Sequence, residues 1–454
     1  MIEPEIATLT VAEKLSKLIK YKTISYNEEE LFDEAEFRGV ITEIETLYPE
    51  CHHVMKREIL NDLALLYTWE GKNKDLDPAV IIAHYDVVPV DDESEWTHPP
   101  FSGEIADGFI WGRGTVDIKN QICAVMEACE KMITSGFQPE RTICLAWGGD
   151  EEVSGPRGAK VIARELEARG VRFAFLMDEG GAISPDQLSM IDKPVALIGV
   201  EEKGILNLTL SCGGKTGHSS MPPAHTAIGT LSEAINKIEN NPFPSRLTTG
   251  TLGLFKAIAP HTKGIYKIIF NNLGIFGGLL KRFLVSDDST NAMIRTSQSV
   301  TIIKGGYREN VLPDRAECNI NFRILPGETI ETVQKRIESI VGNSDVKVEL
   351  NKAVTPNEPI LIRSLDTPFF TAVCDTIKKV YPDAVPAPYL VMGGTDSKNY
   401  ENITDNIFRF SPMMLDRKEM AGMHGVNERI SIENLENMVA FYEELMIHTC
   451  GKVN

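Results

Sequence analysis

The sequence predicts an α/β protein with a mostly parallel sheet, interrupted by an inserted α+β unit of the ferredoxin-like kind. Up to about residue 200, short apolar runs alternate with helical patterns, which is typical of βαβ units and a parallel sheet. After Glu201 the pattern changes to alternating, half-buried strands and amphipathic helices. Their order, β-α-β-β-α-β, is that of the ferredoxin-like fold.

The first part begins with a helix near residues 11–21. Apolar runs then predict buried strands at 79–83, 142–147 and 173–177, and a helix is expected at about 121–135. Each of these runs has the length of a strand and ends in polar or charged residues, which places those residues at the carboxyl ends of the strands.

The second part has its own series of elements. We expect strands at 206–212, 299–304, 315–324 and 346–350, and helices at 225–239 and 328–341. A chain of 454 residues exceeds the size at which a single core stops growing. We therefore place an inserted domain at 203–354, within a first domain made of residues 1–202 and 355–454.

A long apolar segment, residues 255–296, separates the helix at 225–239 from the strand at 299. Two interpretations stay open. The segment either packs within the inserted domain or at a dimer surface, or it forms an apolar wall for a hydrophobic ligand. The second interpretation names Phe255, Ile268, Ile269, Phe270, Ile275 and Phe276 as the lining side chains.

The composition excludes some classes of partner. Forty-six basic and 65 acidic residues give a net charge of −19, which argues against nucleic acid or an anionic membrane. The eight cysteines form no CxxC pair, and several of them lie on apolar faces, as reduced core thiols do. The N-terminus has no signal-peptide pattern, and no apolar run is long enough to span a bilayer. We expect a cytoplasmic protein.

Acidic residues and a histidine follow three of the predicted strands. His84-Tyr-Asp86, Asp150-Glu-Glu152 and Asp178-Glu179 each end an apolar run. In open α/β sheets the ligand site lies beyond the carboxyl ends of the strands. A single charged turn has little meaning, but histidine and carboxylates at three strand ends indicate a divalent metal, for which zinc is the first candidate.

The full set of candidate ligands fits a site for two ions, which needs a bridging carboxylate and further ligands on each side. We assign His84 and Asp178 to one ion, Glu152 and His424 to the other, and Asp117 as the bridge. Either histidine alone would be read as a structural residue, and the surrounding carboxylates change that interpretation. Glu151 is the candidate general base. Asp86 is suited to holding the imidazole of His84. Two zinc ions are expected per chain, with cobalt or manganese as alternatives.

Five motifs resemble the signatures of the M-twenty metallopeptidases. They are His84-Tyr-Asp-Val-Val-Pro89, Gly112-Arg-Gly-Thr-Val-Asp-Ile-Lys119, Gly149-Asp-Glu-Glu152, Met177-Asp-Glu-Gly-Gly181 and His424-Gly-Val-Asn. Trp96-Thr-His-Pro-Pro-Phe-Ser-Gly103, Gly393-Gly-Thr-Asp-Ser397 and the 255–296 segment are similar to the carboxypeptidase S and N-fatty-acyl-amino-acid synthase/hydrolase branch. The resemblance implies zinc, the ligand assignment above, and an inserted domain that acts as a lid and pairs two chains in a homodimer.

The resemblance also implies contacts to the substrate. His218 matches the lid histidine that polarises the scissile carbonyl, frequently from the partner subunit. Asn310 and Arg323 match contacts to the carbonyl and carboxylate of the substrate. Arg323 lies on the strand face opposite Cys318, Ile320 and Phe322 and is free for such a contact, with a surface arginine as the alternative. Backbone N–H groups of Gly393, Gly394, Thr395 and Ser397 are expected at the same carboxylate. Lys398 departs from the arginine that is frequent in this branch, which puts the geometry of the carboxylate contact in doubt.

The function implied by the resemblance is hydrolysis of the amide bond of an N-acyl amino acid with a free carboxylate, with a long acyl chain and a reversible reaction both open. A carboxypeptidase or dipeptidase acting on small peptides is the alternative. A binding protein that kept the fold without catalysis is a third interpretation, disfavoured because Glu151 and all the candidate ligands are present.

Overall fold

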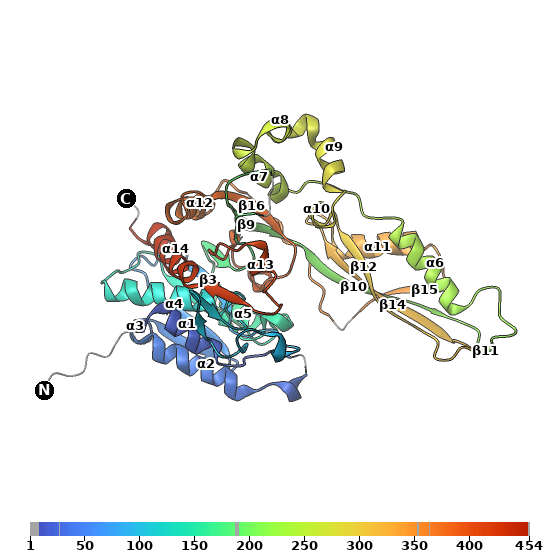
Figure 1. Cartoon of the computed structure of the whole chain (residues 1–454), viewed down its shortest axis with the longest axis horizontal. Helices are drawn as coiled ribbons and strands as arrows, with labels where there is room; N and C mark the ends of the chain where they lie inside the picture. Colours follow the sequence, from blue (N-terminus) through green and yellow to red (C-terminus); the bar gives the residue numbers. More distant parts are fainter. Residues whose placement is uncertain (1–8, 27, 187–189, 352–353, 363, 453–454) are drawn as a thin grey trace.

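The computed structural model describes the chain except residues 1–8, 27, 187–189, 352–353, 363 and 453–454. The chain forms a large α/β body and an elongated α+β extension that projects from it (Figure 1). A nine-stranded, mostly parallel sheet lies at the centre of the body, with the strand order β1-β2-β6-β3-β7-β17-β9-β16, and β8 pairs with β9. The predicted fold class is confirmed.

The strands of the large sheet are β1 (Lys56–Leu60), β2 (Ala64–Trp69), β3 (Ala79–His84), β6 (Ile143–Gly148), β7 (Phe175–Asp178), β8 (Ile183–Ser184), β9 (Val195–Glu202), β16 (Val385–Val391) and β17 (Ile407–Arg409). The helices of the body are α1 (Val11–Ile19), α2 (Glu34–Leu47), α3 (Pro49–Val54), α4 (Lys119–Thr134), α5 (Ala159–Ala168), α12 (Pro368–Val380), α13 (Arg417–Met420) and α14 (Ile432–Cys450). A small sheet joins β4 (Ile105–Ala106), β5 (Phe109–Trp111) and β18 (Arg429–Ser431).

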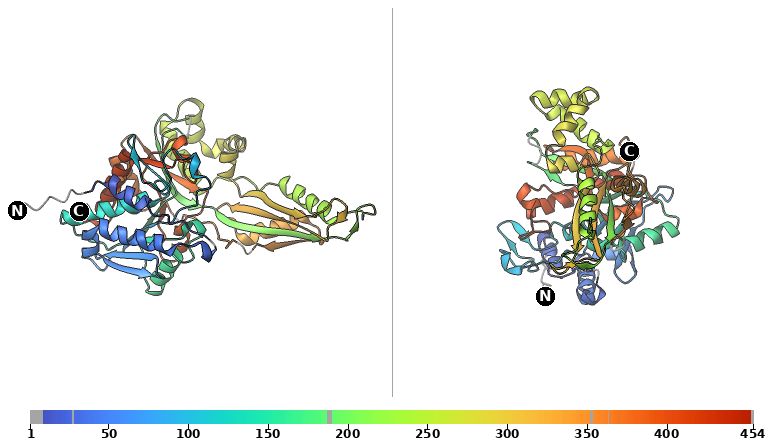
Figure 2. Two further views of the ribbon diagram at one scale, coloured as in Figure 1. Left: turned by 60° about the horizontal axis from the view of Figure 1, so that its bottom comes forward. Right: turned by 90° about the vertical axis from the view of Figure 1, so that its right-hand side faces the viewer.

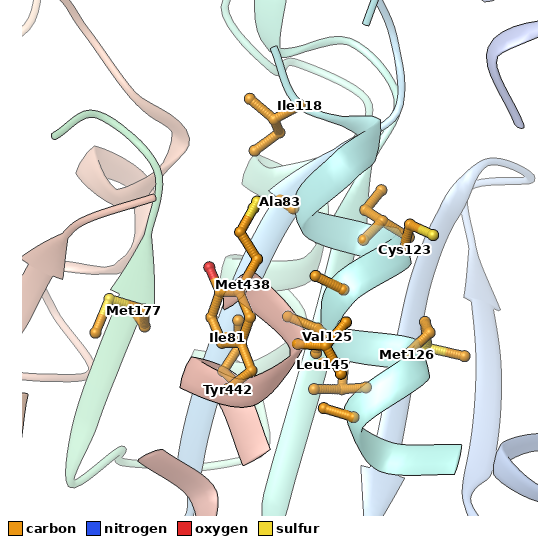
Figure 3. Packing of buried hydrophobic residues seen from close by; sticks show 14 of the residues in the cluster. Ile81, Ala83, Ile118, Cys123, Val125, Met126, Leu145, Met177, Met438 and Tyr442 are labelled. Carbon is orange, nitrogen blue, oxygen red and sulfur yellow. The ribbon is translucent and has the colours of Figure 1, made fainter. Parts of the chain in front are cut away.

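Successive side chains of a strand point to opposite faces of the sheet. Both faces of the large sheet are buried, because helices cover each of them. On one face, Ile81 and Leu145 pack against α4 and α14, where Val125, Met438 and Tyr442 meet them (Figure 3). On the other face, Val80 and Ile82 belong to a core that includes α5. Strands buried on both faces read as continuous apolar runs, which is why the sequence reveals them clearly.

The extension has a four-stranded antiparallel sheet with the order β12-β14-β10-β15. Its elements are β10 (Gly204–Gly213), β11 (Gly217–His218), α6 (Ala227–Glu239), β12 (Ser297–Gly305), β13 (Val311–Leu312), β14 (Arg315–Ile324), α11 (Ile330–Val341) and β15 (Val346–Leu350). This order of strands and helices is the ferredoxin-like one expected for residues 203–354. Its core lies between the sheet and the two helices, with Leu208, Leu231 and Ile337 fully enclosed.

The apolar segment between α6 and β12 is helical, and it packs on the body rather than on the ferredoxin-like sheet. It forms α7 (Thr249–Ile258), α8 (Gly264–Asn271), α9 (Leu273–Leu284) and α10 (Asp288–Ala292). Leu254 and Phe255 of α7 share a core with Val195 of β9 and Val385 of β16. The expectation that this segment packs within the inserted domain therefore differs from its placement. None of the helices in the described part of the chain combines the length and apolar character needed to cross a membrane.

Candidate metal centre

Three neighbouring parallel strands bring most of the candidate ligands together. β6, β3 and β7 are adjacent and parallel, so their carboxyl ends meet at one edge of the sheet. His84 is the last residue of β3, and Asp178 is the last residue of β7. Glu151 and Glu152 form a short 3-10 turn just after β6. The site lies where open α/β sheets place their ligands.

Asp117 reaches the same place from the loop between β5 and α4, and a buried ion pair holds that loop. Oε1 of Glu428 accepts hydrogen bonds from the backbone N–H groups of Gly114 (3.0 Å), Val116 (2.8 Å) and Asp117 (3.2 Å). Oε2 of Glu428 lies 2.6 Å from Nη1 of Arg113, and both side chains are buried. Glu428 follows His424 by four residues, so one segment supplies a candidate ligand and fixes another.

The carboxylate of Asp117 lies between the two histidines. Oδ1 of Asp117 is 3.1 Å from Nε2 of His84, and Oδ2 is 2.8 Å from Nε2 of His424. Nε2 of His424 is also 3.4 Å from Oε1 of Glu152. Two donor atoms about 2.1 Å from one tetrahedral zinc ion are separated by roughly 3.4 Å. The spacing therefore matches two ion positions that share the Asp117 carboxylate.

Several of these atoms lack a hydrogen-bond partner, which tests whether the residues fit a metal. Nε2 of His84, Oδ1 of Asp117 and Oε1 of Glu152 are buried and have no such partner in the described structure. Ligand atoms of these three residues lie within 4.8 Å of one another. Buried polar atoms without a hydrogen bond are costly. Because these atoms lie close together in one buried cluster, divalent cations fit the site.

Glu179, and not Asp178, presents its carboxylate to His84. Oε1 of Glu179 lies 3.3 Å from Nε2 of His84. The oxygens of Asp178 accept hydrogen bonds from the backbone N–H groups of Glu179 (2.8 Å) and Ser397 (2.9 Å). The placement therefore differs from the sequence-based assignment of Asp178 as a ligand. Asp178 is positioned to fix the loop at Ser397, while Glu179 occupies the position expected of the second carboxylate.

Asp86 joins His84 to the turn that carries the two glutamates. Its oxygens accept hydrogen bonds from the backbone N–H groups of Glu151 (3.0 Å) and Glu152 (3.1 Å), and from Oγ of Ser25 (2.6 Å). Nδ1 of His84 lies 3.3 Å from Oδ1 of Asp86. This arrangement orients the imidazole so that Nε2 faces the site, which is the role expected of Asp86.

The carboxylate of Glu151 belongs to the same cluster, with an oxygen within 4.8 Å of ligand atoms of His84 and Glu179. Loss of solvent raises the pKa of Glu151 well above its ordinary value; the nearby His84 opposes the shift, and Asp396 and Glu179 add to it. Burial, with the charge of Asp117, raises the pKa of Glu179 to about 8. Such raised values are typical of carboxyl groups that hold and release protons near neutral pH.

In the metal-free protein, His84, His424 and the carboxylate of Asp117 shift one another's pKa values. Hydrogen bonds to Asp117 and Glu152 raise the pKa of His424 to about 10. Burial lowers the pKa of His84, but the carboxylates of Asp117, Asp86 and Glu179, each within 3.3 Å of its ring nitrogens, outweigh that effect, so the net shift is upward. For Asp117, burial raises the pKa, but the two histidines have the larger effect and together bring it below its ordinary range. A cation that binds at this site therefore competes with protons for both histidines.

His218 and Asn310 do not reach the metal centre of their own chain. His218 pairs with Val311 between β11 and β13, and the backbone oxygen of Asn310 accepts a hydrogen bond of 3.1 Å from Ser219. β11 lies at the far tip of the extension, away from β3 (Figure 1). The side chain of His218 is exposed and lies 2.9 Å from Oγ of Ser220.

The loop after β16 is largely occupied by internal contacts. The backbone N–H of Thr395 donates to Oε1 of Glu202 (3.3 Å), and Oγ1 of Thr395 donates to Oε2 (2.8 Å). Glu202 also forms a fully buried ion pair with Arg409, at 2.7 Å. The N–H groups of Thr395 and Ser397 are thus engaged, whereas those of Gly393 and Gly394 donate no hydrogen bond to any described residue.

A cavity of about 610 Å³ opens beside the metal centre. Glu152, Lys398, Lys160 and Ile205 are among its lining residues, so it lies between the body and the base of the extension. Lys398 supplies a cation at the position where arginine was expected. Arg323 is half-buried on β14, opposite Ile205 of β10, and burial lowers its pKa while the charge of Glu202 opposes that shift.

Three functional positions were missed by the sequence analysis. Glu179 was quoted in a motif but given no role, and Glu428 lies just past the last motif. Asp396 is buried within the Gly393–Ser397 motif, and both its oxygens lack a hydrogen-bond partner among the described residues. The signal that each of them offered is an acidic residue within a motif or just past it, close to the end of a strand.

Carboxypeptidases and N-acyl-amino-acid hydrolases are similar to this chain over nearly its full length. The probable carboxypeptidase S-like 2 of Dictyostelium discoideum is 36% identical over 448 residues, which cover 98% of this chain and 86% of that relative. The N-fatty-acyl-amino acid synthase/hydrolase PM20D1 of Mus musculus is 35% identical over 444 residues, covering 96% and 87%. Carboxypeptidase S of Saccharomyces cerevisiae is 32% identical over 488 residues, covering 96% and 83%.

Solved structures share the fold. The M20 family metallo-carboxypeptidase Sso-CP2 from Sulfolobus solfataricus has a TM-score of 0.71 at 18% identity, covering 96% of this chain and 98% of that one. The Bacillus subtilis YXEP protein, a dinuclear metal binding peptidase, has a TM-score of 0.60 at 14% identity, covering 98% and 99%. The model of Peptidase family M20/M25/M40 matches residues 80–448, so the chain belongs to this family and is a metal-dependent hydrolase of amide or peptide bonds.

Proposed function

We propose that this protein uses two zinc ions to cleave the amide bond of N-acyl amino acids that carry a free carboxylate. The observation that carries the proposal is the Asp117 carboxylate between His84 and His424, with Glu151 in the same cluster. His84, Asp117 and Glu179 would hold one ion, and His424, Asp117 and Glu152 the other. Asp178, the ligand expected from the sequence, would instead fix the loop at Ser397.

When bound, two zinc ions polarise the scissile carbonyl and lower the pKa of the attacking water. Glu151 then acts as the general base. It takes a proton from the water and passes it to the nitrogen of the leaving amino acid. Asp86 holds His84 and the turn of Glu151 in place through the hydrogen bonds described above.

The free carboxylate of the substrate would bind in the cavity beside the metal centre. Lys398 lines this cavity together with Glu152, and the N–H groups of Gly393 and Gly394 are the donors left in the adjoining loop. Arg323 at the base of the extension is the further cation that the sequence assigned to this contact.

The acyl chain would enter apolar cavities next to β16. A cavity of about 770 Å³ has Tyr389 and Met392 in its wall, and Met392 directly precedes the Gly393 loop. A second, almost wholly apolar cavity of about 260 Å³ lies among α7, α8 and α9 and shares Met190 and Phe283 with the first. Phe255, Ile269 and Phe270 line the second cavity. Ile268 and Ile275, also expected in an acyl wall, point to solvent instead.

The distal position of His218 and Asn310 supports a dimer in which these residues serve the partner's metal centre. The two-stranded tip would carry them there through an isologous contact of two extensions. A cytoplasmic location stays part of the proposal. It is supported by the eight cysteines, all of which carry free thiols.

The second candidate is carboxypeptidase or dipeptidase action on small peptides, favoured by the relatives that are named carboxypeptidases. The non-catalytic binding role is not retained, because the chain belongs to a family of metal-dependent hydrolases and Glu151 lies in the cluster with the candidate ligands.

The test is the dependence of kcat/KM on acyl length, from acetyl to oleoyl, with dipeptides measured alongside. Each methylene that enters an apolar channel contributes about 0.8 kcal/mol, or roughly fourfold in kcat/KM, until the channel is full. Phe270→Ala should shorten the range over which the rise occurs. A profile that peaks at acetyl, or faster turnover of dipeptides, would replace the proposed substrate.

A further inference from the structure

The helical pair α8–α9 is the outermost part of the segment inserted between α6 and β12. In Figures 1 and 2 it projects beyond α7, at the top of the molecule and away from both sheets. Phe270, Leu280 and Leu284 anchor the pair on α7 and the body. The other faces of both helices are turned to solvent.

Large apolar side chains occupy these outer faces. Within 21 residues, six of them are exposed, out of 20 in the described part of the chain. They are Ile265 (61% exposed), Ile268 (54%), Ile275 (79%), Leu279 (54%), Phe283 (54%) and Val285 (39%). A cluster of this kind, concentrated on one projection, marks an interaction surface rather than scattered surface residues.

The spacing on α9 shows that the helix has two apolar faces. Leu280 and Leu284 lie four residues apart and are buried. Ile275, Leu279 and Phe283 follow the same spacing on the exposed side. A surface helix of a globular protein normally has one apolar stripe and a polar opposite face. On α9 the side away from the buried stripe also carries large apolar residues, beside the exposed Arg282, so the helix has a second apolar surface.

The charge of the segment is opposite to that of the whole chain. Residues 248–286 contain no aspartate or glutamate, and they contain Lys256, Lys263, Lys267, Lys281 and Arg282. The protein as a whole carries −19. Lys267 lies on α8 between the exposed Ile265 and Ile268, and Lys281 and Arg282 precede Phe283 on α9. Apolar side chains flanked by lysine and arginine are typical of helices that lie in the interface of an anionic bilayer.

We propose that α8–α9 docks on the surface of an anionic lipid bilayer, with Ile268 and Ile275 among the inserted side chains. The basic residues explain the choice of occupant. A second copy of this chain would bring two positive segments together, whereas anionic headgroups complement them. The net charge of −19, which argues against an anionic membrane for the protein as a whole, restricts docking to this basic segment and orients the protein, because the same headgroups repel the remaining surface.

Docking in this way has a consequence that rests on the proposed function. The apolar cavity among α7, α8 and α9 is lined by Ile265, Leu279 and Phe283, which also belong to the exposed set. An N-acyl amino acid with a long chain partitions into bilayers. The docked α8–α9 pair would place the cavity next to the lipid acyl chains of the bilayer, from which such a substrate leaves.

Partitioning of the whole protein onto vesicles, without substrate, tests the proposal. Phosphatidylcholine vesicles with about 30% phosphatidylserine should bind the protein at least tenfold more strongly than vesicles of phosphatidylcholine alone. Ile268→Asp/Ile275→Asp and Lys281→Glu/Arg282→Glu should each weaken the binding at least tenfold. The matched controls are Ile59→Asp on β1, which is 47% exposed in the parent, and Lys347→Glu on β15. Both controls should bind as the parent does.

Equal binding to both vesicle types would overturn the proposal, and so would α8–α9 variants that bind vesicles as the parent does. The proposal would also fail if the α8–α9 variants lost only self-association, because the partner of this surface would then be a second copy of the chain. Thermal melting checks that each variant is folded. If Ile268→Asp/Ile275→Asp does not fold, Lys281→Glu/Arg282→Glu still tests the proposal. Turnover of acyl amino acids in vesicle-free solution reports on the proposed function separately.

Discussion

Nε2 of His84 lies 3.3 Å from Oε1 of Glu179, whereas the neighbouring Asp178 directs its carboxylate to the backbone N–H groups of Glu179 and Ser397. Two adjacent acids at the end of β7 thus have different roles. One faces the cation position and the other fixes the loop that follows β16.

Glu179→Gln should therefore lower the zinc content from about two ions per chain to about one, because the ion at His84 loses a charged ligand. Asp178→Asn keeps one acceptor oxygen for the loop and should retain both ions. Elemental analysis of the two variants, each purified without chelator, makes the comparison. Full zinc content in Glu179→Gln together with loss of an ion in Asp178→Asn would restore Asp178 as the ligand.

Glu151→Gln should separate chemistry from binding. The substitution keeps the size of the side chain and leaves the proposed ligands unchanged, so zinc content and substrate affinity should persist. kcat should fall roughly 10²–10⁴-fold, the usual effect of losing a general base. Steady-state kinetics with parallel zinc analysis is the measurement. A kcat close to that of the parent would exclude Glu151 from this role.

His218 should act on the metal centre of the partner subunit, because it lies at the far tip of its own extension. His218→Ala alone should lose roughly 10²–10³-fold in rate, as expected for a donor to the developing oxyanion. Mixed dimers of His218→Ala and Glu151→Gln chains should regain one working site of the two. Inactive mixed dimers, once their composition is verified, would show that the histidine serves its own chain.

The metal-free protein should become less stable as pH rises between about pH 6 and pH 9. The folded-state pKa values of Glu179 (about 8) and His424 (about 10) lie above their ordinary values of 4.5 and 6.5. The folded state thus binds more protons than the unfolded state, and this stabilising contribution is lost as pH rises through those values. Added zinc should reverse the trend, because its ligands must lose protons.

Melting temperatures with chelator and with zinc, over the same pH range, check this prediction. Glu179→Gln removes one of the titrating groups, so the chelated variant should show a shallower decline than the parent. Identical pH profiles for parent and variant would remove Glu179 from the explanation.

The sequence predicted most of the fold because its strands are buried on both faces and its inserted unit alternates regularly. It also predicted which strand ends converge, since neighbouring parallel strands end at one edge of a sheet. It did not distinguish Asp178 from Glu179, because the last residue of a strand and the next one can each turn toward the site. Nor did it show that the apolar helices rest on β9 and β16, because helical periodicity does not identify the surface that a helix covers.

The most direct test of the central claim is zinc titration of the metal-free enzyme, with turnover of an N-acyl amino acid measured at each ratio. The shared Asp117 carboxylate predicts that turnover rises until about two zinc ions per chain are bound, and that the amidated form of the same substrate is turned over far more slowly. Full turnover without bound zinc, or equal turnover of the acid and its amide, would contradict the account.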